Sequence, residues 1–187
     1  IMATMRCLNA LGARITFSSG VFDVQPIELV KGGTLDCGES GSTLRFLMSV
    51  AAVLGADATF TGAGKLPQRP MGALTDVLAA HGMAFERHTA DELPVTCSGT
   101  LQGGKFTLPG NVSSQYLTGL LFALPLATVD SKIEVTGGLT SASYIDMTID
   151  ALRTAGISVE RRNNIFTIKG NQQYRMPERV VVEGDWS

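Results

Sequence analysis

The chain has 187 residues, and its 15 Lys and Arg residues against 17 Asp and Glu residues give a net charge of −2. This balance lacks the basic excess that nucleic-acid binding requires. A hydrophobic fraction of 44% excludes a disordered chain, and no apolar run reaches the roughly 18 residues of a membrane span. The three cysteines are widely spaced and form no CxxC pair, so neither a disulfide framework nor a metal site is predicted. A globular cytoplasmic protein is expected.

The predicted elements alternate between strands and helices. The chain opens within an amphipathic helix that ends at Gly12, and the alternating residues after Gly12 predict a strand. The next elements complete a unit with the order β-α-β-α-β-β. In chain order they are a strand at 33–37, a helix at 42–54, a strand at 58–61, a helix at 70–81, and strands near 83–87 and 94–98.

The same pattern recurs along the chain. Gly12, Gly82 and Gly156 each follow a helix and precede an alternating strand, and they lie 70 and 74 residues apart. The last copy has predicted helices at 113–127 and 143–155. We therefore predict one α/β (α+β) domain over 1–187, with helices packed inward and sheets outward. Its repeats are an incomplete first at about 1–32, a second at about 33–103 and a third at about 104–187.

Three predicted helices begin with small polar clusters, at 38–43, 110–115 and 140–144. The unpaired N–H groups of a helix N-terminus attract anions, although Ser and Thr there also act as ordinary caps. Arg45 lies in the first turn of its predicted helix, and Arg69 directly precedes Pro70, the predicted first helical residue. A cation at a helix start opposes the helix dipole, which favours an anion-binding role. The alternative is pairing with local acids such as Glu39 or Asp76.

Four motifs carry a resemblance to a known family. The segment Leu-Asp-Cys-Gly-Glu-Ser-Gly-Ser-Thr-Leu-Arg-Phe at 35–46 resembles the Gly-Asn-x-Gly-Thr-x-x-Arg motif of the 5-enolpyruvylshikimate-3-phosphate synthases. The segments at 68–70, 110–115 and 141–146 resemble three further motifs of that family, in the same order and spacing. The segment at 184–187 resembles the point where the family's chain crosses to its other domain.

The resemblance implies an enolpyruvyl transferase-like domain made of three β-α-β-α-β-β units. It also implies an activity: joining shikimate 3-phosphate to phosphoenolpyruvate, with release of phosphate and without metal or organic cofactor. Glyphosate is the expected competitor of phosphoenolpyruvate, and a monomer is expected. The chain resembles most of one of two domains, so the partner domain and an N-terminal segment are expected to be absent. The resemblance implies that the catalytic acid and base lie in that missing domain, which agrees with the lack of a convincing acid or base in this sequence.

The resemblance also implies ligand roles for individual residues. The residues implied to bind shikimate 3-phosphate are Ser113, Ser114, Gln115, Ser141 and Tyr144. The residues implied to bind phosphoenolpyruvate are Gly41, Arg69 and Gln115, and Arg45 is expected to support that pocket.

The sequence departs from the family pattern at two places. Glu39 replaces the usual Asn, and Ala142-Ser143 replaces a basic residue followed by Pro. Glu39 is expected either to pair with Arg45 or to weaken phosphoenolpyruvate binding. Two alternatives stay open. One is a UDP-N-acetylglucosamine enolpyruvyl transferase, which the absence of cysteine from the loop 62–70 disfavours, and the other is an isolated ligand-binding domain without catalysis.

Overall fold

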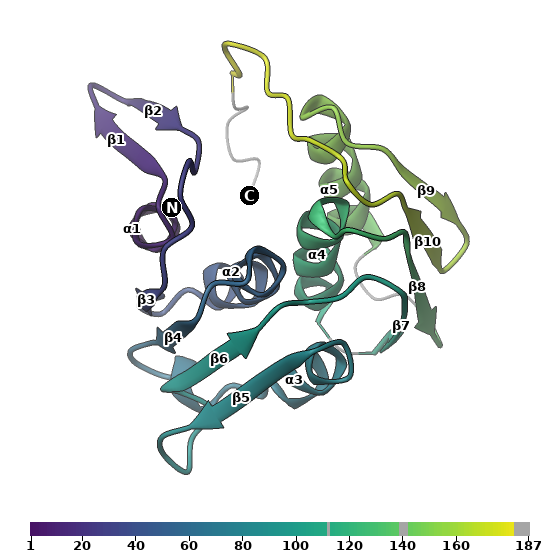
Figure 1. The fold of residues 1–187 in the computed structure, drawn as a ribbon, viewed down its shortest axis with the longest axis horizontal. Coiled ribbons are helices and arrows are strands. Elements are labelled where there is room, and N and C mark those ends of the chain that lie inside the picture. Colours follow the sequence, from purple (N-terminus) through teal and green to yellow (C-terminus); the bar gives the residue numbers. More distant parts are fainter. Residues whose placement is uncertain (112, 139–141, 182–187) are drawn as a thin grey trace.

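The computed structural model describes residues 1–111, 113–138 and 142–181 (Figure 1). The chain begins with helix α1 (Met2–Ala10), followed by strands β1 (Arg14–Ser18) and β2 (Val21–Gln25). The two strands pair antiparallel and form a sheet of their own. In the described parts of the chain, no helix is long and apolar enough to cross a membrane.

A complete β-α-β-α-β-β unit follows the first hairpin. Its elements are β3 (Gly33–Asp36), α2 (Gly41–Leu54), β4 (Ala58–Thr61), the 3₁₀ turn η1 (Leu66–Gln68), α3 (Gly72–Ala79), β5 (Met83–Arg87) and β6 (Val95–Gly99). The four strands form one sheet in the order β3-β4-β6-β5. Strands β3 and β4 are parallel, and α2 makes the crossover that a parallel pair requires.

A second complete unit repeats this arrangement. Its elements are β7 (Lys105–Pro109), α4 (Ser114–Ala123), the 3₁₀ turn η2 (Leu124–Leu126), β8 (Ser131–Thr136), α5 (Ala142–Thr154), β9 (Val159–Arg162) and β10 (Ile165–Ile168). The sheet order is β7-β8-β10-β9, and β7 and β8 are again the parallel pair. The predicted α/β fold class and the predicted order of elements are confirmed.

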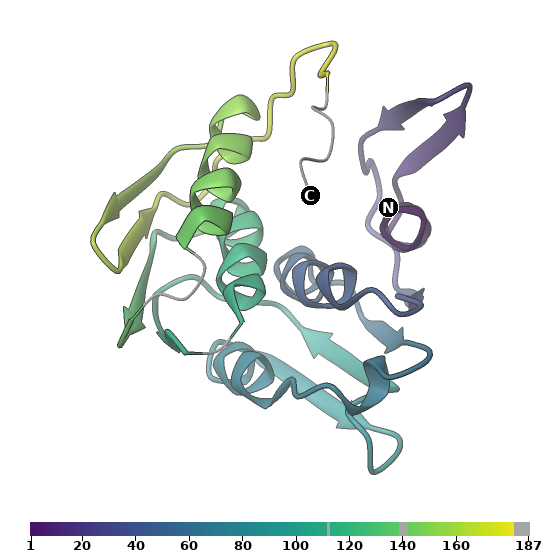
Figure 2. The ribbon, with the colours of Figure 1, turned by 180° about the vertical axis from the view of Figure 1, so that it is seen from behind.

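Helices α2 and α4 lie side by side in the middle of the molecule, and the four-stranded sheets lie outside them (Figures 1 and 2). Both helices are apolar on most of their surface, so they are buried rather than amphipathic. Gly119 on α4 allows the two backbones to approach closely. A Cβ atom on Gly119 would lie 2.6 Å from the carbonyl oxygen of Arg45 on α2.

This contact predicts that replacing Gly119 by alanine destabilises the protein. Alanine is a better helix former than glycine, yet Gly119→Ala is expected to lower the free energy of unfolding by about 1–3 kcal/mol, because the clashing atom is backbone and cannot move aside cheaply. Urea unfolding measures the change. The matched control is Gly72→Ala at the start of α3, where an added Cβ meets nothing within 4 Å. Equal stability changes in both variants would contradict the close packing of α2 and α4.

Two predicted helices were too long: α3 spans Gly72–Ala79 where 70–81 was predicted, and α4 spans Ser114–Ala123 where 113–127 was predicted. Helix α3 begins at Gly72 instead of Pro70: Met71 takes the N-cap position, and its carbonyl accepts the backbone N–H groups of Leu74 and Thr75. Helix α4 ends at Ala123 instead of continuing to 127, because Pro125 has no N–H with which to extend it.

Candidate functional site

The N-termini of α2 and α4 lie together at one end of the helix pair. Nη1 of Arg45 on α2 donates a 2.7 Å hydrogen bond to Oε1 of Gln115 on α4, which joins the two repeated units. Ser113 caps α4, and its hydroxyl oxygen accepts the Gln115 backbone N–H at 3.3 Å. This cap uses Ser113 only as an acceptor, so its hydroxyl hydrogen can still be donated to a ligand. Capping and anion binding are therefore compatible at this helix.

Two guanidinium groups converge on Gly41, the first residue of α2. A Cβ atom on Gly41 would lie 3.0 Å from Nη1 of Arg45 and 3.0 Å from Nη1 of Arg69. The two nitrogens are thus at most twice that distance apart. Like charges so close repel each other by an energy on the order of a few kcal/mol at an effective dielectric constant of 20. An anion bound between them would turn this repulsion into attraction.

Neither arginine is neutralised by an acid among the described residues. No described ion pair contains Arg45 or Arg69, so the alternative of pairing with Glu39 or Asp76 was wrong. The Glu39 carboxylate lies against Gly64, and its Oε2 would be 2.5 Å from a Cβ there. Nε of Arg45 is buried and has no hydrogen-bond partner in the part of the chain that the structure describes. The site therefore carries uncompensated positive charge.

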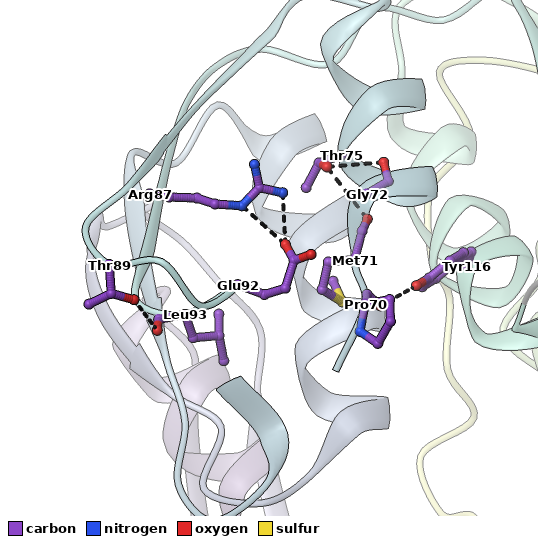
Figure 3. Close-up of polar contacts among 9 residues, drawn as sticks. All are labelled: Pro70, Met71, Gly72, Thr75, Arg87, Thr89, Glu92, Leu93 and Tyr116. Atoms are coloured by element: carbon purple, nitrogen blue, oxygen red, sulfur yellow. Dashed lines mark hydrogen bonds and ion pairs between the residues drawn. The ribbon is translucent and has the colours of Figure 1, made fainter. Parts of the chain in front are cut away.

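The loop that carries Arg69 is held from both sides. On the N-terminal side, the backbone N–H of Glu92 donates to the Pro67 carbonyl at 2.8 Å, and Nε2 of Gln68 donates to Asp91 at 3.2 Å. On the C-terminal side, the Tyr116 hydroxyl donates to the Pro70 carbonyl at 2.7 Å (Figure 3). The Arg69 backbone between these anchors is therefore constrained while its side chain stays exposed.

Tyr116 was not among the site residues predicted from the sequence. Besides its bond to Pro70, its ring faces the Arg45 guanidinium, with 5.6 Å between the guanidinium carbon and the ring centroid. The one available signal was its place directly after Gln115 in the motif at 110–115. Its contact with Pro70, far away in the sequence, gave no local pattern.

An open pocket of about 530 Å³ lies between α2, α4 and α5. Its hydroxyl- and amide-bearing lining residues are Ser42, Ser114, Gln115, Thr118, Tyr144 and Thr148. Its apolar lining residues are Phe46, Phe122, Met147 and Ala151. The pocket thus brings together Ser114, Gln115 and Tyr144 of the predicted shikimate 3-phosphate set. Ser141 and the motif at 184–187 lie outside the described residues.

The described pocket lining contains no carboxyl, imidazole or amino group that could move a proton. Within the described residues, no cluster of three or more His, Cys, Asp and Glu side chains is arranged to hold a metal ion. All three cysteines are buried, and burial raises the pKa of the Cys97 thiol to about 11. The chemistry that this arrangement supports is binding, orientation and stabilisation of negative charge.

Comparisons with known proteins agree with this chemistry. A family model described as EPSP synthase (3-phosphoshikimate 1-carboxyvinyltransferase) matches residues 1–187. The 3-phosphoshikimate 1-carboxyvinyltransferases of Clostridium kluyveri and Clostridium novyi are each 42% identical to the chain and cover all of it. The chain spans 44% and 45% of those relatives. The structure of EPSP synthase from Acinetobacter baumannii matches with a TM-score of 0.75 at 21% identity, over 94% of this chain and 40% of that one.

Proposed function

Because the chain belongs to the EPSP synthase family, we propose that it is part of an enzyme that transfers the enolpyruvyl group of phosphoenolpyruvate to the 5-hydroxyl of shikimate 3-phosphate. The reaction releases phosphate and serves aromatic amino-acid biosynthesis, in the cytoplasm. The observation that supports this function best is the pair of guanidinium groups at Gly41, which have no acidic partner among the described residues and lie next to the hydroxyl-lined start of α4. Both substrates carry several negative charges and require such a site.

The two substrates occupy different parts of the site. Shikimate 3-phosphate occupies the pocket at the start of α4, where Ser113 and Ser114 donate to it and Tyr144 lines its edge; Ser141 is assigned by the family resemblance. Phosphoenolpyruvate lies against Gly41 and Arg69, with Arg45 supporting that pocket.

Gln115 contributes to both substrate positions. Its Oε1 accepts from Arg45, and its side-chain NH₂ group has donors left for a ligand. The Gln115 amide thus joins the two halves of the site.

The proposed reaction proceeds by addition and elimination. The 5-hydroxyl oxygen of shikimate 3-phosphate gives up its proton to a base and forms a bond to C2 of phosphoenolpyruvate, while the C2=C3 double bond opens and a proton adds to C3. The tetrahedral intermediate then breaks the bond between C2 and the phosphate oxygen and loses a proton from C3. This chain holds both substrates in reach and balances their charge. The groups that move the protons belong to the second domain, which lies beyond residues 1–187 and closes over the site.

Phosphate release by the full-length protein tests the proposed function. We expect release only when phosphoenolpyruvate and shikimate 3-phosphate are both present, and we expect glyphosate to compete with phosphoenolpyruvate. The control replaces shikimate 3-phosphate by UDP-N-acetylglucosamine and should give no phosphate. Release with the nucleotide sugar alone would support the alternative transferase instead. Absence of release with either acceptor would contradict enolpyruvyl transfer.

The isolated chain provides a separate test of the shikimate 3-phosphate site that it contains. We expect shikimate 3-phosphate to shift the amide resonances of Ser113, Ser114 and Tyr144 in a titration followed by NMR. Ser114→Ala should weaken this binding roughly 10- to 100-fold, because a hydrogen bond to a charged group contributes about 1.5–3 kcal/mol. Ser18→Ala, at the exposed end of β1, is the control and should leave the affinity unchanged. A dispersed spectrum without any response would contradict binding by this chain alone.

A further inference from the structure

Tyr116 connects the two arginines of the site. It lies in the first turn of α4, directly after Gln115, and its side chain is buried with 5% exposure. Its hydroxyl donates to the carbonyl of Pro70, the residue after Arg69, at 2.7 Å (Figure 3). Its ring faces the Arg45 guanidinium at 5.6 Å. One rigid side chain thus contacts one arginine directly and the other through the backbone.

The Arg69 side chain needs such a backbone anchor. In the described part of the chain, its guanidinium forms no ion pair or hydrogen bond, so its direction depends on where its backbone is held. The backbone N–H of Arg69 donates to Leu66 at 3.1 Å, which fixes the near side of the loop. The backbone N–H groups of Leu74 and Thr75 in α3 donate to the carbonyl of Met71, and the Pro70 carbonyl accepts from Tyr116.

When no substrate is bound, another contact must oppose the electrostatic repulsion between the two guanidinium groups. They converge on Gly41 with no acidic partner in the part of the chain that the structure describes, and their mutual repulsion favours moving apart. The negative face of the Tyr116 ring attracts the Arg45 cation, while the hydroxyl holds the Arg69 loop in place. The same residue therefore opposes the separation from both sides.

Resting on the proposed function, we propose that Tyr116 is a positioning residue that sets the spacing of Arg45 and Arg69 before phosphoenolpyruvate binds. Preorganised cations bind an anion more tightly, because the ligand does not have to order them. Tyr116 touches no substrate in this proposal. Its loss therefore weakens phosphoenolpyruvate binding and leaves shikimate 3-phosphate binding almost unchanged.

Steady-state kinetics of the full-length protein test this role. Tyr116→Phe removes the hydroxyl and keeps the ring, and we expect the KM for phosphoenolpyruvate to rise about 3- to 10-fold, as the loss of one neutral hydrogen bond predicts. Tyr116→Leu also removes the aromatic face and should raise this KM further. For Tyr116→Phe, kcat and the KM for shikimate 3-phosphate should stay within about twofold of the parent values.

The chain supplies a matched control in Tyr174. Its hydroxyl donates to the Phe122 carbonyl at 2.7 Å, a bond of the same kind and length that lies away from the arginine pair. Tyr174→Phe should cost similar stability and leave the KM for phosphoenolpyruvate unchanged. A similar rise of both KM values in Tyr116→Phe, or no rise in either, would overturn the positioning role.

A crystal structure of Tyr116→Phe separates this proposal from the proposed function. If the parent protein shows no turnover, the proposed function fails, and the structure alone decides the role of Tyr116. Movement of the Arg69 or Arg45 Nη1 atom away from Gly41 in the variant supports positioning. Both atoms staying against Gly41 overturns it.

Discussion

Replacing Arg69 by alanine in the full-length protein is expected to raise the KM for phosphoenolpyruvate roughly 10- to 100-fold. A hydrogen bond between charged groups contributes about 1.5–3 kcal/mol, which corresponds to that range. The KM for shikimate 3-phosphate should change by less than about twofold. The reason is the position of the Arg69 side chain, whose Nη1 lies next to Gly41, as does Nη1 of Arg45. The Glu39 carboxylate lies against Gly64 and does not neutralise this pair of cations.

The stability of the fold should not depend on Arg69. Its side chain is exposed and forms no described ion pair, so Arg69→Ala should keep the unfolding midpoint of the parent. Arg69→Lys keeps the charge and loses the planar fork, and its KM should fall between those of the parent and Arg69→Ala. Arg153→Ala is the control, since Arg153 is exposed and pairs with Asp150 at 2.6 Å. An unchanged KM for phosphoenolpyruvate in Arg69→Ala would contradict the site assignment.

The largest expected loss of stability follows from Phe60→Ala. Phe60 lies on the inner strand β4 with 0% exposure, and its strand neighbours are Leu35 on β3 and Val95 on β6. Truncating a buried phenylalanine removes its transfer free energy and leaves a cavity, which together cost about 3–5 kcal/mol. This is a large part of the roughly 5–15 kcal/mol that holds a typical domain folded.

Urea unfolding followed by circular dichroism measures this loss. The control is Phe17→Ala, because Phe17 on β1 is 48% exposed and packs against the tilted ring of Phe22. We expect the control to lose much less stability than Phe60→Ala. Similar losses in the two variants would show that β4 is not the inner strand of a packed sheet.

Local patterns in the sequence were enough to predict the repeated β-α-β-α-β-β order. Glycines such as Gly82 and Gly156 follow helices and have φ angles of 101° and 75°, which other residues rarely adopt. Backbone hydrogen bonds within a helix join residues four apart, and side chains alternate along a strand. These short-range rules can be read from a single stretch of chain. The cluster at Ser113–Gln115 was likewise visible as a helix start.

Contacts between distant segments decided the rest. The predicted start of α3 at Pro70 was wrong, since the helix begins at Gly72 and the Pro70 carbonyl pairs with a hydroxyl on α4. The sequence named Arg45 and Arg69 as candidates, but it could not show whether acids neutralise them or whether they meet at Gly41. Side-chain convergence depends on how α2 and α4 pack and where the loop before α3 is anchored. No periodicity in the sequence encodes those distances. Only the tertiary structure therefore decided that the two arginines lie together without a neutralising acid among the described residues, and that Tyr116 contacts both of their segments.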